Sequence, residues 1–176
     1  MKTIYLDHAA TTPLDHRVKA AMEPYWADIY ANPSSLYRLG REAKKAIEGA
    51  RMTAAKLFNA KPNEIVFTGG GTEAINLALF GVARAYRSAA RHLATTSIEH
   101  HAVLHAFDAL KDEGFKTTRV GVDRDGIVDV RNLRKAIRDD TILVSVMYAN
   151  NEIGTIQPIR DIAAMVREVR KERKQR

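Results

Sequence analysis

Hydrophobic positions along the chain alternate between helical spacing and strand spacing. Between a turn at residues 32–35 and about Phe58, apolar residues recur every three or four positions, which predicts one long helix with a buried face. Residues 141–148 form an apolar, β-branched run, which predicts a central strand. By the same criteria, helices are predicted at 13–28, 72–87, 101–113, 130–138 and from 158 onward, and strands at 65–68, 92–97 and 116–122.

The order of these elements predicts the fold class. Strands that are joined by helices favour an α/β fold, with a mostly parallel sheet and helices on both faces. Residues 1–12 show no helical spacing and are expected to form an extended N-terminal lead-in, so the domain itself would cover residues 13–176. No internal repeat and no Gly/Ser linker divides that domain. The sequence therefore predicts one α/β domain preceded by a short extended segment.

Three of the predicted loops follow the carboxyl ends of strands, where ligands bind in parallel α/β sheets. These loops cover residues 69–72, 98–101 and 149–154. They also contain the glycines, histidines and asparagines that are best suited to chemistry. The sequence therefore predicts one ligand site at this edge of the sheet.

The first of these loops has the composition of a phosphate-binding turn. Its three glycines, at 69–71, allow an anion to approach the backbone closely. The predicted helix that follows offers free N–H groups and the positive end of its dipole, and Thr72 adds a hydroxyl group. No Gly-Lys-Ser/Thr sequence follows, which excludes a nucleoside-triphosphate loop. A plain turn between a strand and a helix is the alternative at this point.

The other two loops carry histidine and asparagine side chains. His100 is suited to stacking on an aromatic ring or to proton transfer, and the Asn151 amide can donate to an anionic oxygen and accept from a donor. His101 and His105 have a spacing that is compatible with a metal, but no glutamate lies between them in the zincin position and no third ligand is near. We therefore expect no metal. For the asparagines, an ordinary turn is the alternative.

Composition and charge limit the binding partners and the cellular location that we expect for this chain. The 176 residues carry a net charge of +7, and the last ten positions hold six basic residues against two acids, the pattern of a solvated helix end. No groove-reading motif is present, so we expect no nucleic acid and no membrane as partners. With no signal peptide in the sequence, a cytoplasmic location is expected. The absence of cysteine excludes disulfides and a cysteine nucleophile within this chain.

Several segments together resemble the cysteine desulfurases of the class V aminotransferase group, in that family's order and with its spacing. The resemblance extends over essentially the whole chain. It implies that residues 13–176 form the incomplete large domain of a fold type I transferase that depends on pyridoxal 5'-phosphate (PLP), truncated before the Schiff-base lysine. The matching segments are residues 5–13 (YLDHAATTP), 32–35 (NPSS), 67–76 (FTGGGTEAIN), 99–103 (EHHAV), 125–127 (DGI) and 141–147 (TILVSVM) continuing into 150–154 (NNEIG).

The resemblance also implies roles for individual residues. Gly71 and Thr72 match the turn that binds the PLP phosphate, and His100 matches the catalytic histidine that stacks on the pyridine ring and takes part in proton transfer. Asn151 matches the asparagine near the cofactor's phenolic oxygen and the substrate carboxylate, while Ala10 and Thr11 match a segment that borders the substrate site. The implied reaction converts L-cysteine to L-alanine and leaves the sulfur as a persulfide on the enzyme.

Several groups that the family uses have no counterpart in this sequence. They are an Asp that pairs with the pyridine nitrogen, a Gln, the Schiff-base lysine and a loop bearing the catalytic cysteine. We therefore expect that activity needs a complementing C-terminal chain or segment, and that the isolated chain, whether naturally split or truncated, is inactive. A homo-oligomer and a sulfur-acceptor protein are further expected partners. Two alternatives stay open: a related class V aminotransferase or selenocysteine lyase, and a non-catalytic remnant that acts as a dimerisation or scaffold module.

Overall fold

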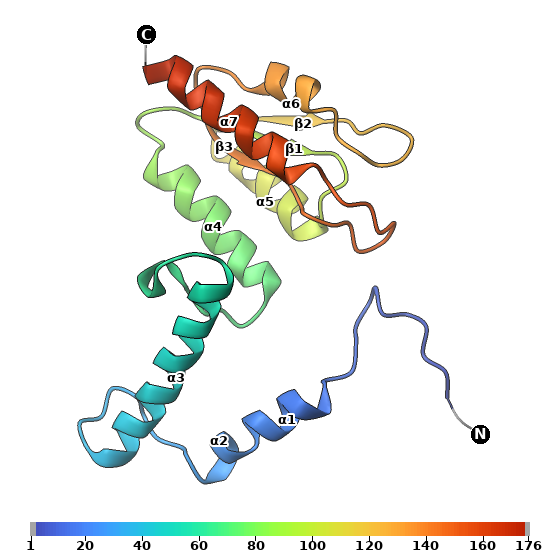
Figure 1. Cartoon of the computed structure of the whole chain (residues 1–176). Helices are drawn as coiled ribbons and strands as arrows, with labels where there is room; N and C mark the ends of the chain where they lie inside the picture. Colours follow the sequence, from blue (N-terminus) through green and yellow to red (C-terminus); the bar gives the residue numbers. More distant parts are fainter. Residues whose placement is uncertain (1–2, 175–176) are drawn as a thin grey trace. The chain divides into compact units, whose positions relative to one another are not determined.

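The computed structural model describes residues 3–174, which divide into two compact units, one ending at Phe67 and the other beginning at Thr68 (Figure 1). The predicted boundary between a lead-in at 1–12 and a domain at 13–176 stays a prediction. The first unit is helical, and its elements are α1 (His16–Met22), α2 (Pro24–Ala27), α3 (Arg38–Leu57) and the 3-10 turn η1 (Pro62–Glu64).

Hydrogen bonds and close contacts of nearby residues determine the helices of the first unit. α1 begins after Asp15, because the Asp15 carboxylate accepts the N–H of Arg17 at 2.8 Å and so caps the helix. The single helix predicted at 13–28 is therefore wrong in its bounds, since a separate helix starts at Pro24. The long helix predicted up to about Phe58 is confirmed as α3. Gly40 is required there, because a Cβ atom at this position would lie 2.5 Å from the Ser35 carbonyl oxygen.

The strand predicted at 65–68 is wrong. These residues form no regular element, and Val66 and Phe67 are 66% and 52% exposed. Backbone in a strand needs a neighbour to accept and donate its hydrogen bonds, and no strand among residues 3–174 pairs with this segment. Instead, the Arg51 guanidinium donates to the Ile65 carbonyl and lies 5.0 Å from the centre of the Phe67 ring.

The second unit is built around a three-stranded parallel sheet. Its strands are β1 (His92–Thr96), β2 (Lys116–Val120) and β3 (Thr141–Ser145), in the order β2-β1-β3. Both neighbours run parallel to β1. Every residue of β1 is buried, as expected for a strand that has a partner on each side and helices on each face.

Helices cover both faces of this sheet, as Figure 1 shows. Leu93 and Phe107 belong to the core on one face, whereas Val144 and Leu133 belong to the core on the other. The predicted α/β class, with a parallel sheet and helices on both faces, is therefore confirmed. The helices are α4 (Gly71–Ala85) and α5 (His101–Asp112) on the first face, and α6 (Val130–Ala136) and α7 (Ile159–Lys174) on the second.

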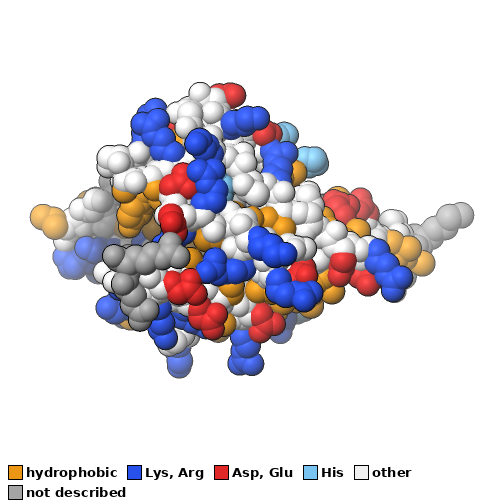
Figure 2. Space-filling view, turned by 90° about the horizontal axis from the view of Figure 1, so that it is seen from above, with side chains coloured by type: hydrophobic (Ala, Val, Ile, Leu, Met, Phe, Trp, Pro, Cys, Tyr) orange, Lys and Arg blue, Asp and Glu red, His pale blue; other side chains and the backbone are white. Residues whose placement is uncertain are grey.

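Basic and acidic side chains are mixed on the face of the molecule that Figure 2 shows. In Figure 2, Lys and Arg side chains are interspersed with Asp and Glu over the face in view. Arg134 of α6, for example, pairs with Glu172 of α7 at 2.6 Å. The basic end predicted as a helix terminus is confirmed for residues 167–174, which lie in α7, while its last two residues fall outside the described part of the chain. Within residues 3–174, no helix has both the length and the apolar character needed to cross a bilayer.

A buried histidine at the start of β1 connects all three strands. His92 is fully buried, and its two ring nitrogens lie 2.6 Å from the Thr141 hydroxyl of β3 and 2.9 Å from the Thr118 hydroxyl of β2. The Thr141 hydroxyl also accepts the N–H of Arg138 at 2.7 Å, so it connects the start of β3 to the residues before it. Burial lowers the pKa of His92 below its ordinary value of 6.5, assisted by the nearby charge of Arg138.

This histidine makes stability depend on pH. As pH falls below about 6.5, the unfolded chain takes up a proton at position 92 before the folded chain does, so the free energy of unfolding should fall. We expect the stability advantage of the native chain over His92→Gln to shrink between pH 7.5 and about pH 5.5. Urea unfolding followed by circular dichroism measures this difference. His16→Gln is the control, because the His16 side chain is 91% exposed, and a pH-independent difference for His92→Gln would contradict the account.

Candidate functional site

The N-terminal end of α4 is open to an anion. α4 begins at Gly71, and no side chain caps its first turn, so the first N–H groups of the helix face outward from the loop. A Cβ atom added at Gly70 or Gly71 would meet nothing within 4 Å, which leaves space beside the backbone. The N–H of Gly69 is not free, because it donates to the Glu73 carboxylate at 2.7 Å. The first N–H groups of α4 and the exposed Thr72 hydroxyl remain, and such a donor set suits a phosphate group.

A buried carboxylate joins the loop after β1 to the loop after β3. Glu99 is 6% exposed, and its Oε1 accepts the Thr96 hydroxyl at 2.7 Å and the N–H of Met147 at 2.9 Å. Burial raises the pKa of Glu99 above its ordinary value, while the two hydrogen bonds act in the opposite direction. Glu99 therefore sets the position of the residue that follows it, His100.

His100 is the N-cap residue of α5. Its Nδ1 accepts the N–H of Ala102 at 3.1 Å, so the neutral ring carries its proton on Nε2. The hydrogen bond holds the ring at the start of the helix, and the side chain is exposed. His101 and His105 lie on the same helix with their ring centres 5.7 Å apart. Among residues 3–174, no group of three or more His, Cys, Asp or Glu side chains is arranged to hold a metal ion.

Two adjacent asparagines follow β3, and the structure gives them different surroundings. Asn150 is half-buried, and its amide donates to the Ile98 carbonyl at 2.9 Å, while its Oδ1 accepts the N–H groups of Glu152 and Ile153. Asn151 is exposed, and within residues 3–174 its amide donates only to the Glu152 carboxylate, at 2.9 Å. Asn150 therefore shapes the loop, and Asn151 has an amide available to a ligand.

The structure brings together some of the predicted site residues. The loops that carry His100 and Asn151 are joined directly, through Glu99 and Asn150. α4 packs against α5, and Figure 1 shows the two helices running in the same direction, so Gly71 and Thr72 lie at the same end of the helix pair as His100.

Ala10 and Thr11 belong to the first unit. There, the N–H groups of both residues donate to the carbonyl of Asp7 and form a turn. Their assignment to the substrate site stays a prediction, as do the individual roles of the other predicted site residues.

Sequence reasoning missed two residues that organise this site, Glu99 and Asn150. Their importance lies in contacts with residues 48 and 52 positions away in the chain, which leave no spacing pattern in the sequence. The only available signal was their position, since each directly precedes a predicted site residue in a loop at the end of a strand.

The chain belongs to the class V aminotransferase family. The family model, described as aminotransferase class-V, matches residues 4–171. The cysteine desulfurase IscS of Methanosarcina thermophila is 51% identical over 167 residues, which make up 95% of this chain and 41% of that protein. The cysteine desulfurase IscS of Dictyoglomus turgidum is 49% identical over 167 residues, or 95% of this chain and 42% of that protein. The predicted family is thus confirmed, and the chain spans less than half the length of these relatives.

Solved structures show the same fold. A NifS-like protein that is 42% identical superposes with a TM-score of 0.91, over 94% of this chain and 45% of that one. SspA in complex with cysteine is 39% identical, with a TM-score of 0.90 over 94% of this chain and 48% of that one. The fold is therefore that of part of a larger enzyme of this family.

The contrast between the two asparagines is testable. Asn150→Ala removes four side-chain hydrogen bonds, one of them to the Met147 sulfur, and leaves the N–H groups of Glu152 and Ile153 without their acceptor, so it should lower the free energy of unfolding by about 1–3 kcal/mol. Asn151→Ala removes one exposed contact and should change that free energy by less than about 0.5 kcal/mol. Urea unfolding measures both values. Equal losses for the two variants would show that Asn150 does not anchor the loop.

Proposed function

We propose that this chain forms the phosphate-facing and ring-facing part of the PLP site of a cysteine desulfurase, in the cytoplasm. One observation carries the proposal: the open N-terminal end of α4 lies at the same end of a helix pair as His100, whose loop is hydrogen-bonded to the loop of Asn151. Family membership supports PLP as the ligand of this arrangement, and two relatives named cysteine desulfurase, about half identical to this chain, support the reaction.

Each residue of the site has a task that follows from its surroundings. The first N–H groups of α4, from Gly71 and Thr72, bind the phosphate, and the Thr72 hydroxyl adds a donor. The His100 ring, held through Nδ1, stacks on the pyridine ring and exchanges a proton at Nε2. The Asn151 amide binds the phenolic oxygen of the cofactor and the carboxylate of the substrate. Ala10 and Thr11 border the substrate.

PLP, when bound, supplies an electron sink for bond cleavage in an amino acid. The proposed overall reaction breaks the C–S bond of L-cysteine, releases L-alanine and transfers the sulfur to an enzyme thiol as a persulfide. This chain contains no cysteine, so the thiol has to come from a complementing C-terminal segment or chain, which also supplies the lysine that anchors PLP. A homo-oligomeric assembly and a protein that accepts the sulfur complete the proposal.

The test uses the chain produced together with the part of the Methanosarcina thermophila relative that follows the matched region. We expect this pair to bind PLP and to form alanine from L-cysteine. His100→Gln should lower kcat by at least about 100-fold, the contribution typical of a positioned proton-transfer group. His105→Gln, an exposed change on the same helix, is the control and should leave kcat unchanged.

Other outcomes identify the alternatives. A pair that binds PLP and acts on another amino acid or on selenocysteine, but not on L-cysteine, would replace the proposed reaction by that of a related enzyme. A pair that assembles without binding PLP would show that this chain is a scaffold or dimerisation module. Equal activity of His100→Gln and the native chain would remove the role given to His100.

A further inference from the structure

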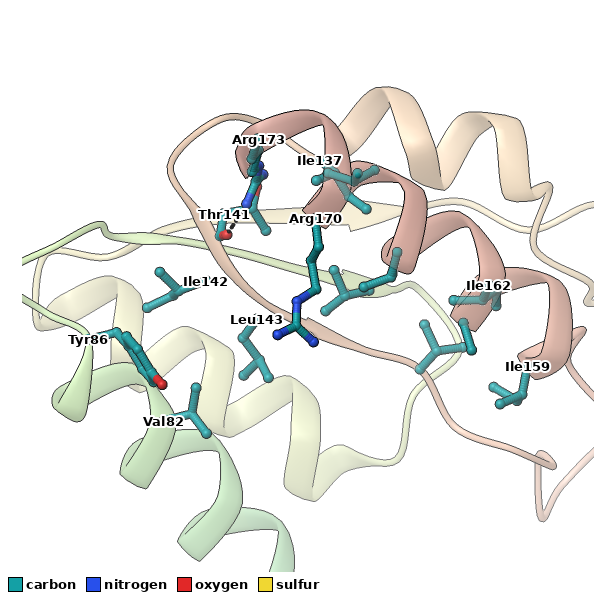
Figure 3. Close-up of a pocket in the computed structure, with 15 residues that line it drawn as sticks. Val82, Tyr86, Ile137, Thr141, Ile142, Leu143, Ile159, Ile162, Arg170 and Arg173 are labelled. Atoms are coloured by element: carbon teal, nitrogen blue, oxygen red, sulfur yellow. Dashed lines mark hydrogen bonds between the residues drawn. The ribbon is translucent and has the colours of Figure 1, made fainter. Parts of the chain in front are cut away.

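A basic pocket opens at the amino-terminal ends of the three strands. Its volume is about 510 Å³, within the range of about 300–1,000 Å³ that small-molecule sites have. The larger groove beside β3 is lined mainly by apolar side chains (Figure 3), whereas three cationic side chains and no aromatic ring line the basic pocket. Its lining consists of residues 87–91, Gly114, Lys116 and Asp140.

Strand pairing brings these residues together. His92, at the start of β1, lies opposite Lys116 of β2 and Thr141 of β3, so the three strands begin at the same level. The N–H of Lys116 donates to the Arg91 carbonyl at 2.7 Å, and the N–H of His92 donates to the Asp140 carbonyl at 3.0 Å. The loop after α4, the turn after α5 and the residue before β3 therefore meet at one place.

Backbone carbonyls hold the two arginines of the basic pocket. A terminal nitrogen of the Arg87 guanidinium donates to the Glu113 carbonyl at 3.2 Å, and Nε of Arg91 donates to the Arg87 carbonyl at 3.4 Å. Each of these hydrogen bonds uses one nitrogen of a guanidinium that has five N–H donors. The rest of each planar group is therefore available to a ligand, in a position that the backbone helps to fix.

The positive charge of the basic pocket is not balanced within residues 3–174. None of its three cations forms an ion pair in that part of the chain. Asp140, the one acid in the lining, already pairs with Arg138 at 2.8 Å. Glu113, in the turn after α5, pairs with Arg84 at 2.6 Å. Because like charges that lie close together repel one another, an anion between the three cations would stabilise the arrangement.

Shape and charge together favour a small anion with several negative charges. The fork of N–H groups on arginine fits phosphate oxygens, and lysine adds a point charge. A concave site of this size suits a small molecule better than the broad surface of a protein partner. Since no aromatic ring lines the pocket, a nucleobase has nothing to stack on there. A diphosphate group has enough negative charge to face all three cations.

We propose that the basic pocket binds a diphosphate group between Arg87, Arg91 and Lys116. Parallel strands of five residues are about 16 Å long, and this pocket lies at their amino-terminal ends, whereas the loops of His100 and Asn151 follow their carboxyl ends. The anion site is thus separated from the candidate PLP site by the length of the sheet. The inference does not depend on the proposed function.

The test is isothermal titration calorimetry of the chain with pyrophosphate at low ionic strength, where exposed charges are least screened. We expect Arg91→Gln and Lys116→Gln to weaken binding at least tenfold, because each removes a charged donor from the pocket. Arg160→Gln, the same change of charge at an exposed arginine of α7 outside the lining, is the matched control and should leave the affinity unchanged.

Nuclear magnetic resonance of the native chain locates the anion without any variant. We expect pyrophosphate to shift the amide signals of residues 87–91 and 114–116, and we expect Thr72→Val to bind it as tightly as the native chain. Shifts confined to residues 69–73, with binding lost in Thr72→Val, would place the anion at the start of α4. That result would overturn the inference and leave the proposed function in place.

Further ligands identify the source of the diphosphate group. Tighter binding of ADP than of pyrophosphate, lost in Arg91→Gln, would support the inference with a nucleotide as the ligand. Equal or weaker binding of ADP would support it with a free diphosphate as the ligand. A chain that binds a single-stranded oligonucleotide but not pyrophosphate, or that binds neither, would overturn the inference.

Discussion

Parallel pairing of β1 with both of its neighbours is the constraint on which the second unit depends. Parallel strands cannot be joined by tight hairpins, so each return of the chain passes through a helix, and these helices cover both faces of the sheet. The same constraint places the loops after β1 and β3 at one edge, where Glu99 and Asn150 connect them. The candidate site is thus a direct result of strand direction, and its loops are held by a few hydrogen bonds with well-defined partners.

The strands of the sheet are buried to different extents. β1 is complete, with partners on both sides and a buried histidine connecting it to each neighbour. Among residues 3–174, β3 has a partner strand on one side only, and its other side borders an apolar groove between two helices. The chain spans less than half the length of the relatives that it matches.

Much of the fold could be predicted because its signals are local. The apolar spacing of α3 and the β-branched run of β3 each predict their element from neighbouring residues alone, with no knowledge of long-range contacts. Residues 65–68 have an equally good strand pattern, but a strand forms only where a partner is present, and sequence spacing does not reveal that. The position of the site could also be predicted, because ligands bind beyond the carboxyl ends of the strands in parallel α/β sheets. The roles of Glu99 and Asn150 could not be predicted, since they depend on contacts between distant loops.

The central claim is that this chain supplies the non-covalent part of a PLP site. The most direct test is the intact mass of each polypeptide after borohydride reduction of the chain and its complementing segment with PLP. The account predicts a PLP adduct on the complementing polypeptide and none on this chain, with the yield reduced when Thr72 is changed to Val. An adduct at one specific lysine of this chain, or a yield that does not depend on Thr72, would contradict the account.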